Sequence, residues 1–276
     1  MKKIISMILA LAMVLVCGCA MAETADNSLQ AIIDKGELIL GLDDTFPPMG
    51  FRDDDNNIVG YDIDLATEVC ARLNVKLVCQ PIDWSAKELE LSEGNIDCIW
   101  NGMSITDERK EAMAMTEAYM NNKIVVVAKN DSGIASVADL AGKTVAVQGG
   151  SFAEEVFETY EDYADEYASV KEVLAYDEYL TALMDLQQGG VDAVLIDLIV
   201  AEYRIAGLED DTLVVVAELE DDLYGIGFRK ADVALRDKVW EILNDMAEDG
   251  TMAKISEKWF GKDISVVGAV EEAAAE

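Results

Sequence analysis

The feature that most restricts the fold of this chain is a pair of short matches between its two halves. Residues 36–46 (GELILGLDDTF) resemble 142–152 (GKTVAVQGGSF), and residues 94–102 (GNIDCIWNG) resemble 189–197 (GGVDAVLID). Each match is weak by itself, but the two occur in the same order and at similar intervals. Repetition of this kind indicates two structural units of related build, so we expect the 276 residues to form two lobes.

Around these matches, short apolar runs alternate with segments of helical periodicity. In the first half, strands are expected at 36–42, 75–79 and 96–100, with helices at 60–73 and 85–92 between them. Such alternation requires crossover connections and favours a parallel sheet. We therefore predict an α/β fold with doubly wound lobes.

The second half repeats the pattern. Strands are expected at 143–147, 170–174 and 191–196, and helices begin at Ser151 and Glu178. A second lobe of the same class is the simplest explanation.

The segment after Gly225, with helices expected at 231–248 and 252–259, exceeds what the second lobe needs. We expect it to return to the first lobe, so that the chain crosses between the lobes twice, near Asn121 and Gly225, and the two crossings would make a hinge. The resulting division is a leader at 1–22, lobe 1 at 23–120 and 226–263, lobe 2 at 121–225, and a disordered acidic tail at 264–276.

Charge and composition exclude several classes of function. The chain has 55 acidic and 21 basic residues, a formal net charge of −34, which argues against binding to nucleic acids or anionic membranes. It contains no histidine, so Ser-His-Asp and Cys-His catalysis and histidine zinc sites are excluded. We expect no metal and no cofactor.

The N-terminus has the pattern of an export signal. Lys2 and Lys3 precede an apolar run at 4–16, which is too short to span a membrane as a mature helix. Two processing sites remain open: cleavage after Ala22, or a lipobox in which Cys19 becomes the acylated N-terminus. Either predicts an exported protein, anchored by lipid or released into the periplasm or medium.

Three cysteines remain after such cleavage: Cys70, Cys79 and Cys98. An odd number permits at most one disulfide. Cys70 and Cys79 could pair, or all three could be apolar core residues; the sequence leaves both alternatives open.

Polar residues follow the expected strands where each one ends. These strand ends are Asp43, Asn101, Gln148 and Asp197. Ligands of doubly wound sheets bind beyond the carboxyl ends of the strands. With two lobes face to face, all four residues are expected to open on one cleft.

The segment NGMSITDER (101–109) offers groups suited to an anion. Gly102 and Ser104 supply an N–H group and a hydroxyl, Thr106 begins a helix, and Arg109 lies one turn further on. A guanidinium beside a helix N-terminus can grip a carboxylate. The alternative is an ordinary ion pair between Arg109 and a neighbouring acid of the same helix.

Other residues complete the pattern of an α-amino acid site. Asp197 ends an apolar strand, where a carboxylate is costly unless it meets a cation such as an ammonium group; a helix cap is the alternative. Phe46 and Trp84 provide flat rings at the rim, and Gly150 and Ser151 offer further N–H donors.

Several motifs of this chain occur together in one known family. They are LGLDDTFPPMGF, IVGYDIDLATEV, NGMSITDERKEAM, LAGKTVAVQGGSFAEE and DAVLID, in order from residue 36 to residue 262. With them the chain resembles the polar amino-acid-binding, type 3 solute-binding proteins of ABC importers. The resemblance implies a type II periplasmic-binding-protein fold, whose two lobes are joined by a two-strand hinge and close on the ligand.

The resemblance also implies roles for particular residues. Arg109 and Ser104 correspond to the α-carboxylate partners, Asp197 to the α-ammonium acceptor, and Asp43 to a contact with the distal group of cationic ligands. Asn101 and Phe152 depart from the residues common in the family. The full expected ligand-binding set is Asp43, Phe46, Trp84, Asn101, Gly102, Met103, Ser104, Arg109, Gln148, Ser151, Phe152 and Asp197.

The function implied is that of a receptor rather than an enzyme. We expect a monomer that captures a free polar L-amino acid and delivers it to an ABC transporter permease. The doubled acid Asp43-Asp44 favours a cationic ligand such as arginine or lysine; glutamine, histidine and cystine remain open. The alternative is a dehydratase of the same fold acting on prephenate or arogenate.

Overall fold

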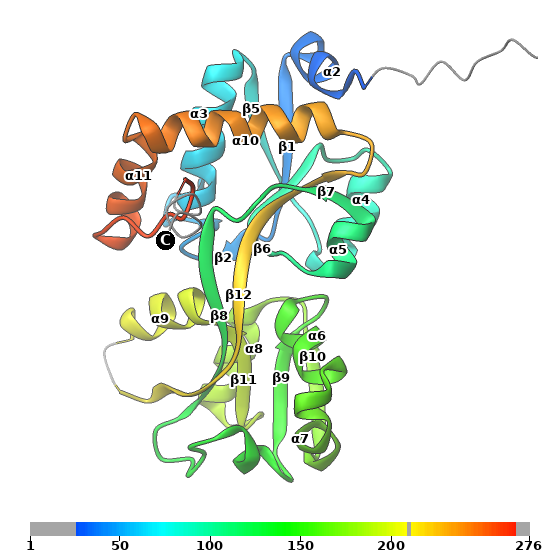
Figure 1. Ribbon diagram of the computed structural model, residues 1–276. Helices are drawn as coiled ribbons and strands as arrows, with labels where there is room; N and C mark the ends of the chain where they lie inside the picture. The colour runs from blue at the N-terminus through cyan, green and yellow to red at the C-terminus, as the bar shows by residue number, and fades with distance from the viewer. Residues whose placement is uncertain (1–25, 209–210, 269–276) are drawn as a thin grey trace, which may run out of the picture.

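The chain folds into two lobes connected by a pair of long strands (Figure 1). A computed structural model describes residues 26–208 and 211–268, so the expected leader lies outside the described residues. The connecting strands are β8 (Met120–Lys129) and β12 (Leu213–Arg229), which pair antiparallel along their length. They form the two-strand hinge.

Lobe 1 is built around the parallel strands β1 (Glu37–Leu42), β5 (Lys76–Pro81) and β6 (Cys98–Ser104). The remaining strands are β7 (Met113–Met115), which pairs with β12, and a small sheet of β2 (Thr45–Phe46), β3 (Gly50–Arg52) and β4 (Ile58–Val59). The helices are α2 (Ser28–Lys35), α3 (Tyr61–Leu73), η1 (Trp84–Ala86), α4 (Lys87–Ser92), α5 (Asp107–Ala112), α10 (Val233–Glu248) and α11 (Thr251–Phe260).

Lobe 2 is built around the parallel strands β9 (Thr144–Gln148), β10 (Glu172–Tyr176) and β11 (Ala193–Asp197). Its helices are η2 (Val137–Leu140), α6 (Phe152–Thr159), η3 (Glu161–Tyr163), α7 (Ala164–Ser169), α8 (Tyr179–Gln188) and α9 (Leu198–Ala206).

The two lobes share one strand order. In lobe 1 the central strand β1 lies between β5 and β6, and in lobe 2 the central strand β9 lies between β10 and β11, all parallel. The full order is β10-β9-β11-β8-β12-β6-β1-β5. The predicted α/β class with two doubly wound lobes is therefore confirmed.

The sequence repeat has a physical basis in an aspartate that precedes β6 in lobe 1 and β11 in lobe 2. The Asp97 carboxylate accepts the backbone N–H of Ile39 at 2.8 Å, and the Asp192 carboxylate accepts that of Thr144 at 2.8 Å. These equivalent bonds fix the structural register, in which Ile39 corresponds to Thr144. The letter match 36–46 with 142–152 is therefore one residue out of register.

Apolar residues are buried on both faces of the sheet. Successive residues of β11 belong to opposite clusters: Val194 and Ile196 to a core that continues through both lobes, and Leu195 to a second core within lobe 2. In lobe 1, Ile99 likewise packs on the face opposite Trp100. Helices therefore cover both faces, which explains why these strands consist of continuous apolar runs.

The disordered tail was predicted to begin at residue 264, which is too early. Residues 264–268 pack against lobe 1: Ser265 pairs with Met120, Val266 donates its N–H to the Tyr119 carbonyl at 3.1 Å, and Val267 is buried. The rest of the tail lies outside the described residues. Cys70, Cys79 and Cys98 are free thiols, so Cys70 and Cys79 do not pair in this structure. Cys70 and Cys98 are buried as expected for core residues, whereas Cys79 is half-buried.

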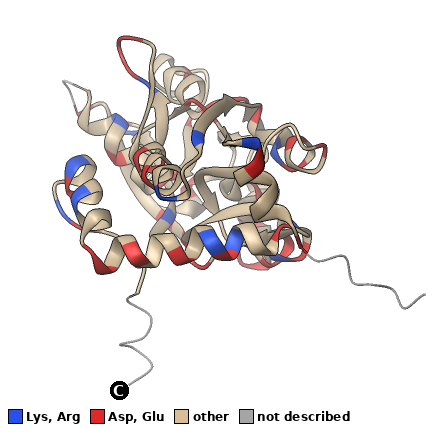
Figure 2. Ribbon diagram, turned by 90° about the horizontal axis from the view of Figure 1, so that it is seen from above, with Lys and Arg blue, Asp and Glu red and all other residues tan. Residues whose placement is uncertain are grey.

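Acidic residues are spread over helices all round the molecule, with basic residues between them (Figure 2). Within residues 26–208 and 211–268, no helix combines the length and hydropathy needed to cross a membrane.

Candidate ligand-binding site

A narrow cavity lies between the lobes at the carboxyl ends of the central strands. Nine of the twelve expected residues line it: Phe46, Trp84, Gly102, Ser104, Arg109, Gln148, Ser151, Phe152 and Asp197. Its volume is about 10 Å³, roughly what a single water molecule requires. The lobes are therefore closed, and a larger ligand would enter only after they separate.

Direct hydrogen bonds join the closed lobes. Gln148 Nε2 donates to Asp43 Oδ2 at 2.7 Å, and Lys87 Nζ donates to the Gly150 carbonyl at 2.8 Å. Burial, followed by the charge of Arg109, lowers the pKa of Lys87 to about 8. These contacts exist only when the lobes meet, so they contribute to the stability of the closed form.

Arg109 lies on the lobe 1 side of the cavity, held by the start of α5. The Thr106 hydroxyl caps this helix by accepting the Arg109 N–H at 3.2 Å. The guanidinium donates to the Ser104 carbonyl at 2.9 Å and to the Gly150 carbonyl at 3.3 Å. No carboxylate of the described residues lies within 4.0 Å of it, so the alternative of an ordinary ion pair is not what the structure shows.

Asp197 lies on the lobe 2 side, at the end of β11. It occupies the N-cap position of α9 without a side-chain cap bond. Instead, its Oδ1 accepts from Asn122 Nδ2 at 2.8 Å and from the Tyr224 hydroxyl at 2.6 Å. Burial and then the nearby charge of Asp222 raise its pKa to about 7. A cation beside this carboxylate would be stabilising.

The aromatic residues form part of the cavity wall. The rings of Phe46 and Tyr179 pack with centroids 6.0 Å apart, and the Lys87 ammonium lies 5.2 Å from the Trp84 ring. The three aromatic residues of the lining, Phe46, Trp84 and Phe152, are buried in the closed form.

Three expected residues do not line the cavity. Asn101 turns away from it and accepts the Asp43 N–H at 3.0 Å. Met103 is fully buried and belongs to the lobe 1 core that also contains Met113. Asp43 lies beside the cavity, where it accepts from Gln148 and from the backbone and hydroxyl of Thr45.

The expected N–H donors of the second lobe are already engaged. The N–H of Gly150 donates to Glu154 Oε2 at 2.7 Å, and that of Ser151 to the Gln148 carbonyl at 3.2 Å. The Ser151 hydroxyl caps α6 by accepting the Glu154 N–H. It is the Gly150 carbonyl, not its N–H, that faces Arg109.

Comparison with known proteins identifies the family. Residues 38–262 match the model for bacterial extracellular solute-binding proteins, family 3. The chain belongs to this family.

Named family members are similar over most of their length. The L-cystine-binding protein TcyJ of Escherichia coli (strain K12) is 30% identical, with 92% of this chain and 94% of that protein covered. The arginine-binding extracellular protein ArtP of Bacillus subtilis (strain 168) is 31% identical, with coverage of 90% and 96%. The histidine-binding periplasmic protein of Salmonella typhimurium is 31% identical, with coverage of 88% and 94%.

Solved structures show the same fold. An ABC uptake transporter substrate-binding protein from Streptococcus pneumoniae with bound histidine superimposes with a TM-score of 0.82 at 38% identity, covering 88% of this chain and 99% of that one. An ancestral amino-acid-binding protein described as a precursor of cyclohexadienyl dehydratase gives 0.76 at 31% identity, covering 84% and 99%. The named relatives are binding proteins rather than enzymes, and the resemblance found in the sequence is confirmed.

Sequence reasoning missed several buried polar residues behind the cavity of this family 3 protein. Asp62, in the first turn of α3, accepts the Gly102 N–H at 2.8 Å and the Tyr119 hydroxyl at 2.9 Å. Burial raises its pKa to about 7. Its position inside the motif IVGYDIDLATEV was the available signal. On the hinge strands, Asn122 and Asp222 were also missed.

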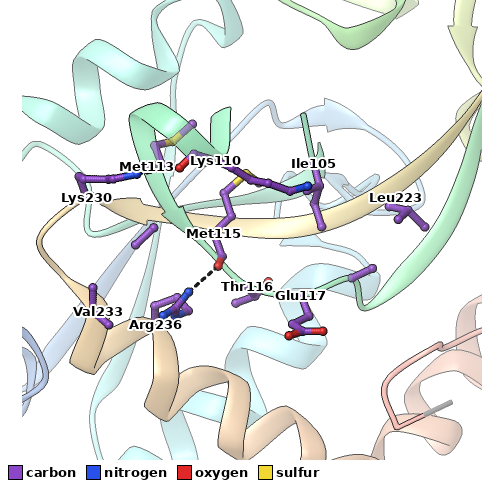
Figure 3. A pocket seen from close by; sticks show the side chains of 12 residues that line it. Ile105, Lys110, Met113, Met115, Thr116, Glu117, Leu223, Lys230, Val233 and Arg236 are labelled. Atoms are coloured by element: carbon purple, nitrogen blue, oxygen red, sulfur yellow. Dashed lines mark hydrogen bonds between the residues drawn. The ribbon is translucent and has the colours of Figure 1, made fainter. Parts of the chain in front are cut away.

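A larger hollow of about 640 Å³ lies elsewhere on lobe 1, between α5, β7 and α10 (Figure 3). None of the expected ligand residues lines it. Its cations already have partners: Arg236 donates to the Met115 carbonyl at 2.9 Å, and Lys230 donates to the Lys110 carbonyl at 2.8 Å. Size alone does not make it the ligand site, because the cations of its described lining, Arg236, Lys230 and Lys110, are already bound to oxygen atoms of lobe 1.

Gly102 provides a stability prediction. Its φ is +61°, and a Cβ there would lie 2.7 Å from the Phe46 ring and 3.0 Å from the Tyr224 ring. We expect Gly102→Ala to destabilise the fold by about 1–3 kcal/mol, because strain and steric overlap add. Gly94→Ala is the matched control, with φ +78° and no atom within 4 Å of the added carbon. Thermal unfolding of both variants checks this; equal losses would show that the contact is not tight.

Proposed function

We propose that this protein is the extracytoplasmic receptor of an ABC importer and that it captures a polar L-amino acid by closure of its lobes. The observation that carries the proposal is the placement of Arg109 and Asp197 on opposite sides of one enclosed cavity. The first can bind an α-carboxylate, and the second an α-ammonium group.

Closure accounts for both affinity and delivery. Each lobe contributes only part of the site, so a ligand that touches both lobes stabilises the closed form over the open one. A permease that contacts both lobes could then distinguish the loaded receptor from the empty one. The relatives named above as cystine-, arginine- and histidine-binding proteins support an amino acid as the ligand.

Acidic residues beside the cavity support a cationic side chain on the ligand. Asp43 and Glu178 lie close enough for the charge of Asp43 to raise the pKa of Glu178, after the larger effect of burial. Arg204, which donates to the Thr45 carbonyl at 3.1 Å, offsets part of this charge. We propose arginine or lysine first, and glutamine, histidine or cystine next.

Calorimetric titration with a panel of amino acids tests the proposal. We expect one member to bind far more tightly than 1 mM, which corresponds to about −4 kcal/mol. If arginine is the ligand, agmatine lacks the carboxylate and 5-guanidinopentanoate lacks the ammonium group, so both should bind at least about 100-fold more weakly. A panel in which nothing binds below about 1 mM would contradict the proposal.

A dehydratase acting on prephenate or arogenate is the second candidate. One observation favours it: Asp197 is a buried carboxyl with a pKa raised to about 7, which could act as a general acid. The ancestral amino-acid-binding protein named as a precursor of cyclohexadienyl dehydratase adds only that the folds are related. Incubation with prephenate separates the candidates, because a dehydratase produces absorbance from phenylpyruvate and a receptor does not.

We propose an exported location, as the relatives named extracellular or periplasmic suggest. Mass spectrometry of the mature protein distinguishes acylation at Cys19 from a free N-terminus after Ala22. A monomer is the simplest state for this mechanism, and sedimentation measures it.

Lys87 provides a prediction about closure. We expect Lys87→Met to weaken amino acid binding about tenfold, because the closed form loses a charge-assisted bond to Gly150 worth roughly 1.5–3 kcal/mol. Glu88→Gln is the control, since it removes only the ion pair between Glu88 and Lys87 at 3.3 Å. Dissociation constants of the two variants should differ; equal values would mean that the Lys87 contact does not support closure.

A further inference from the structure

Behind the cavity, a chain of buried hydrogen bonds crosses the hinge from one lobe to the other. The Ser104 hydroxyl of lobe 1 donates to Asp222 Oδ2 at 3.0 Å. Asn122 Nδ2 donates to the same Asp222 oxygen at 2.9 Å and to Asp197 Oδ1 of lobe 2 at 2.8 Å. Asn122 and Asp222 are direct partners on β8 and β12.

We propose that Asp222 is a positioning residue which makes the ammonium site doubly acidic: Asp197 and Asp222 together retain one proton in the unliganded closed form and release it when an ammonium group binds. This inference rests on the proposed function, since it concerns the same site. In this proposal the hinge strands, which carry Asn122 and Asp222, contribute to ligand binding as well as to the movement of the lobes.

The charge of the cluster requires a counterpart. Asp197, Asp222 and Asn122 are buried, with 5%, 4% and 7% of their surface exposed. Among residues 26–208 and 211–268, no lysine or arginine forms an ion pair with either carboxylate within 4.0 Å. The groups that donate to the two carboxylates are all neutral: the Asn122 amide, the hydroxyls of Ser104 and Tyr224, and the Leu223 N–H. They do not neutralise two buried negative charges, so a proton or an external cation is favoured there.

The titratable groups that face the pair do not remove this need. Tyr224 donates to Asp197, and the Tyr179 hydroxyl lies nearby on α8; burial keeps both phenols neutral by raising their pKa. Arg109 on α5 acts on Asp222 from a greater distance, while Glu155 on α6 adds further negative charge.

Tyr160 is the last of these facing groups. It follows α6, and the charge of Asp222 contributes to raising its pKa, after burial and the charges of Glu155 and Glu220. Burial raises the pKa of Asp222, and burial together with the charge of Asp222 raises that of Asp197. Protonation of Asp197 therefore depends on the charge of Asp222, to which the Asn122 amide links it.

The hydrogen-bond directions suit an ammonium donor. A hydroxyl has one proton, so Ser104, which donates it to Asp222, can only accept from the ligand. The side-chain amide oxygen of Asn122, Oδ1, is buried and accepts no hydrogen bond from the described residues. Ser104 and Asp197 line the cavity, and we propose that they and this oxygen accept from the three N–H groups of an ammonium ion. Asp222 acts through Ser104 and Asn122, which it orients.

Proton release makes affinity depend on pH. Below the pKa of Asp197, which is about 7, a proton competes with the ammonium group. Lowering the pH from 8 to 6 should then weaken binding about tenfold. A ligand that carries no ammonium group should show no such dependence.

Calorimetry at pH 6 in two buffers of different ionisation enthalpy measures the proton count. With L-arginine as ligand, or L-cystine if it binds more tightly, we expect the wild-type protein to release close to one proton. In Asp222→Asn, burial still raises the pKa of Asp197 but the second charge is gone. The midpoint of the affinity–pH curve should therefore fall by about one pH unit or more.

Asp221→Asn is the matched control, because Asp221 is an exposed neighbour on β12 that pairs with Lys123. Its midpoint should equal that of the wild type. The same midpoint in Asp222→Asn would overturn the inference, as would tight binding by the wild type without proton release, a measurement that needs no variant. Failure of the wild type to bind any amino acid would instead count against the proposed function.

Discussion

Replacing Arg109 by alanine is expected to weaken amino acid binding about 100- to 1,000-fold and to leave the protein folded. The guanidinium is the cation of lobe 1 that lines the cavity, and the variant would leave the ligand carboxylate buried without a partner. Removing one member of a buried ion pair costs roughly 3–5 kcal/mol. Calorimetric titration of the variant measures the loss.

The control for this variant is the next residue. Lys110 is exposed and pairs with Asp107 at 3.4 Å on the surface of α5, so Lys110→Ala should bind like the wild type. Circular dichroism must show that Arg109→Ala is folded, since its guanidinium also donates to the Ser104 carbonyl. An unchanged dissociation constant in a folded Arg109→Ala protein would remove this residue from the site.

Replacing Asp197 by asparagine is expected to abolish tight binding and, at the same time, to stabilise the unliganded protein at alkaline pH. The carboxyl has a folded-state pKa of about 7, above the usual value of about 3.9 in an unfolded chain. Its contribution to stability is therefore complete below about pH 4 and is lost as the pH rises through about 7.

Asparagine does not titrate, so the variant escapes this loss. Its melting temperature relative to the wild type should be higher at pH 8 than at pH 5, with a free-energy difference on the order of a few kcal/mol. Glu202→Gln, exposed on α9, should change neither affinity nor this pH dependence. If the difference in melting temperature between Asp197→Asn and the wild type were the same at pH 5 and pH 8, the pKa of Asp197 would not be raised.

The two lobes could be predicted because their helices and strands follow from patterns of neighbouring residues. Apolar runs, helical periodicity and the two repeated segments depend on neighbouring residues, and α10 and α11 begin and end within two residues of the expected helices. The residues alone predicted the hinge only as two crossings, and the family resemblance implied that the crossings are strands. The 17-residue β12 contains the acidic stretch ELEDD, which has no apolar period, and tertiary pairing with β8 makes it a strand.

The site could be predicted in outline for a related reason. Strand ends are visible in sequence, and they brought together Ser104, Gln148 and Asp197. Side-chain direction is less visible: Met103 points into the core although its neighbours face the cavity. Asp222 could not be found, because its importance arises from a partner 100 residues away in the chain, Asn122.

The two crossings of the hinge have a further meaning for how such proteins diversify. The chain leaves lobe 1 through β8 and returns through β12, and these two strands pair side by side. Lobe 2 is therefore an insertion whose two ends lie next to each other. The segment 123–221 could therefore be exchanged between family members as one module without altering the path of the remaining chain. One wall of the site could then change its chemistry while the other, with Arg109, is inherited intact.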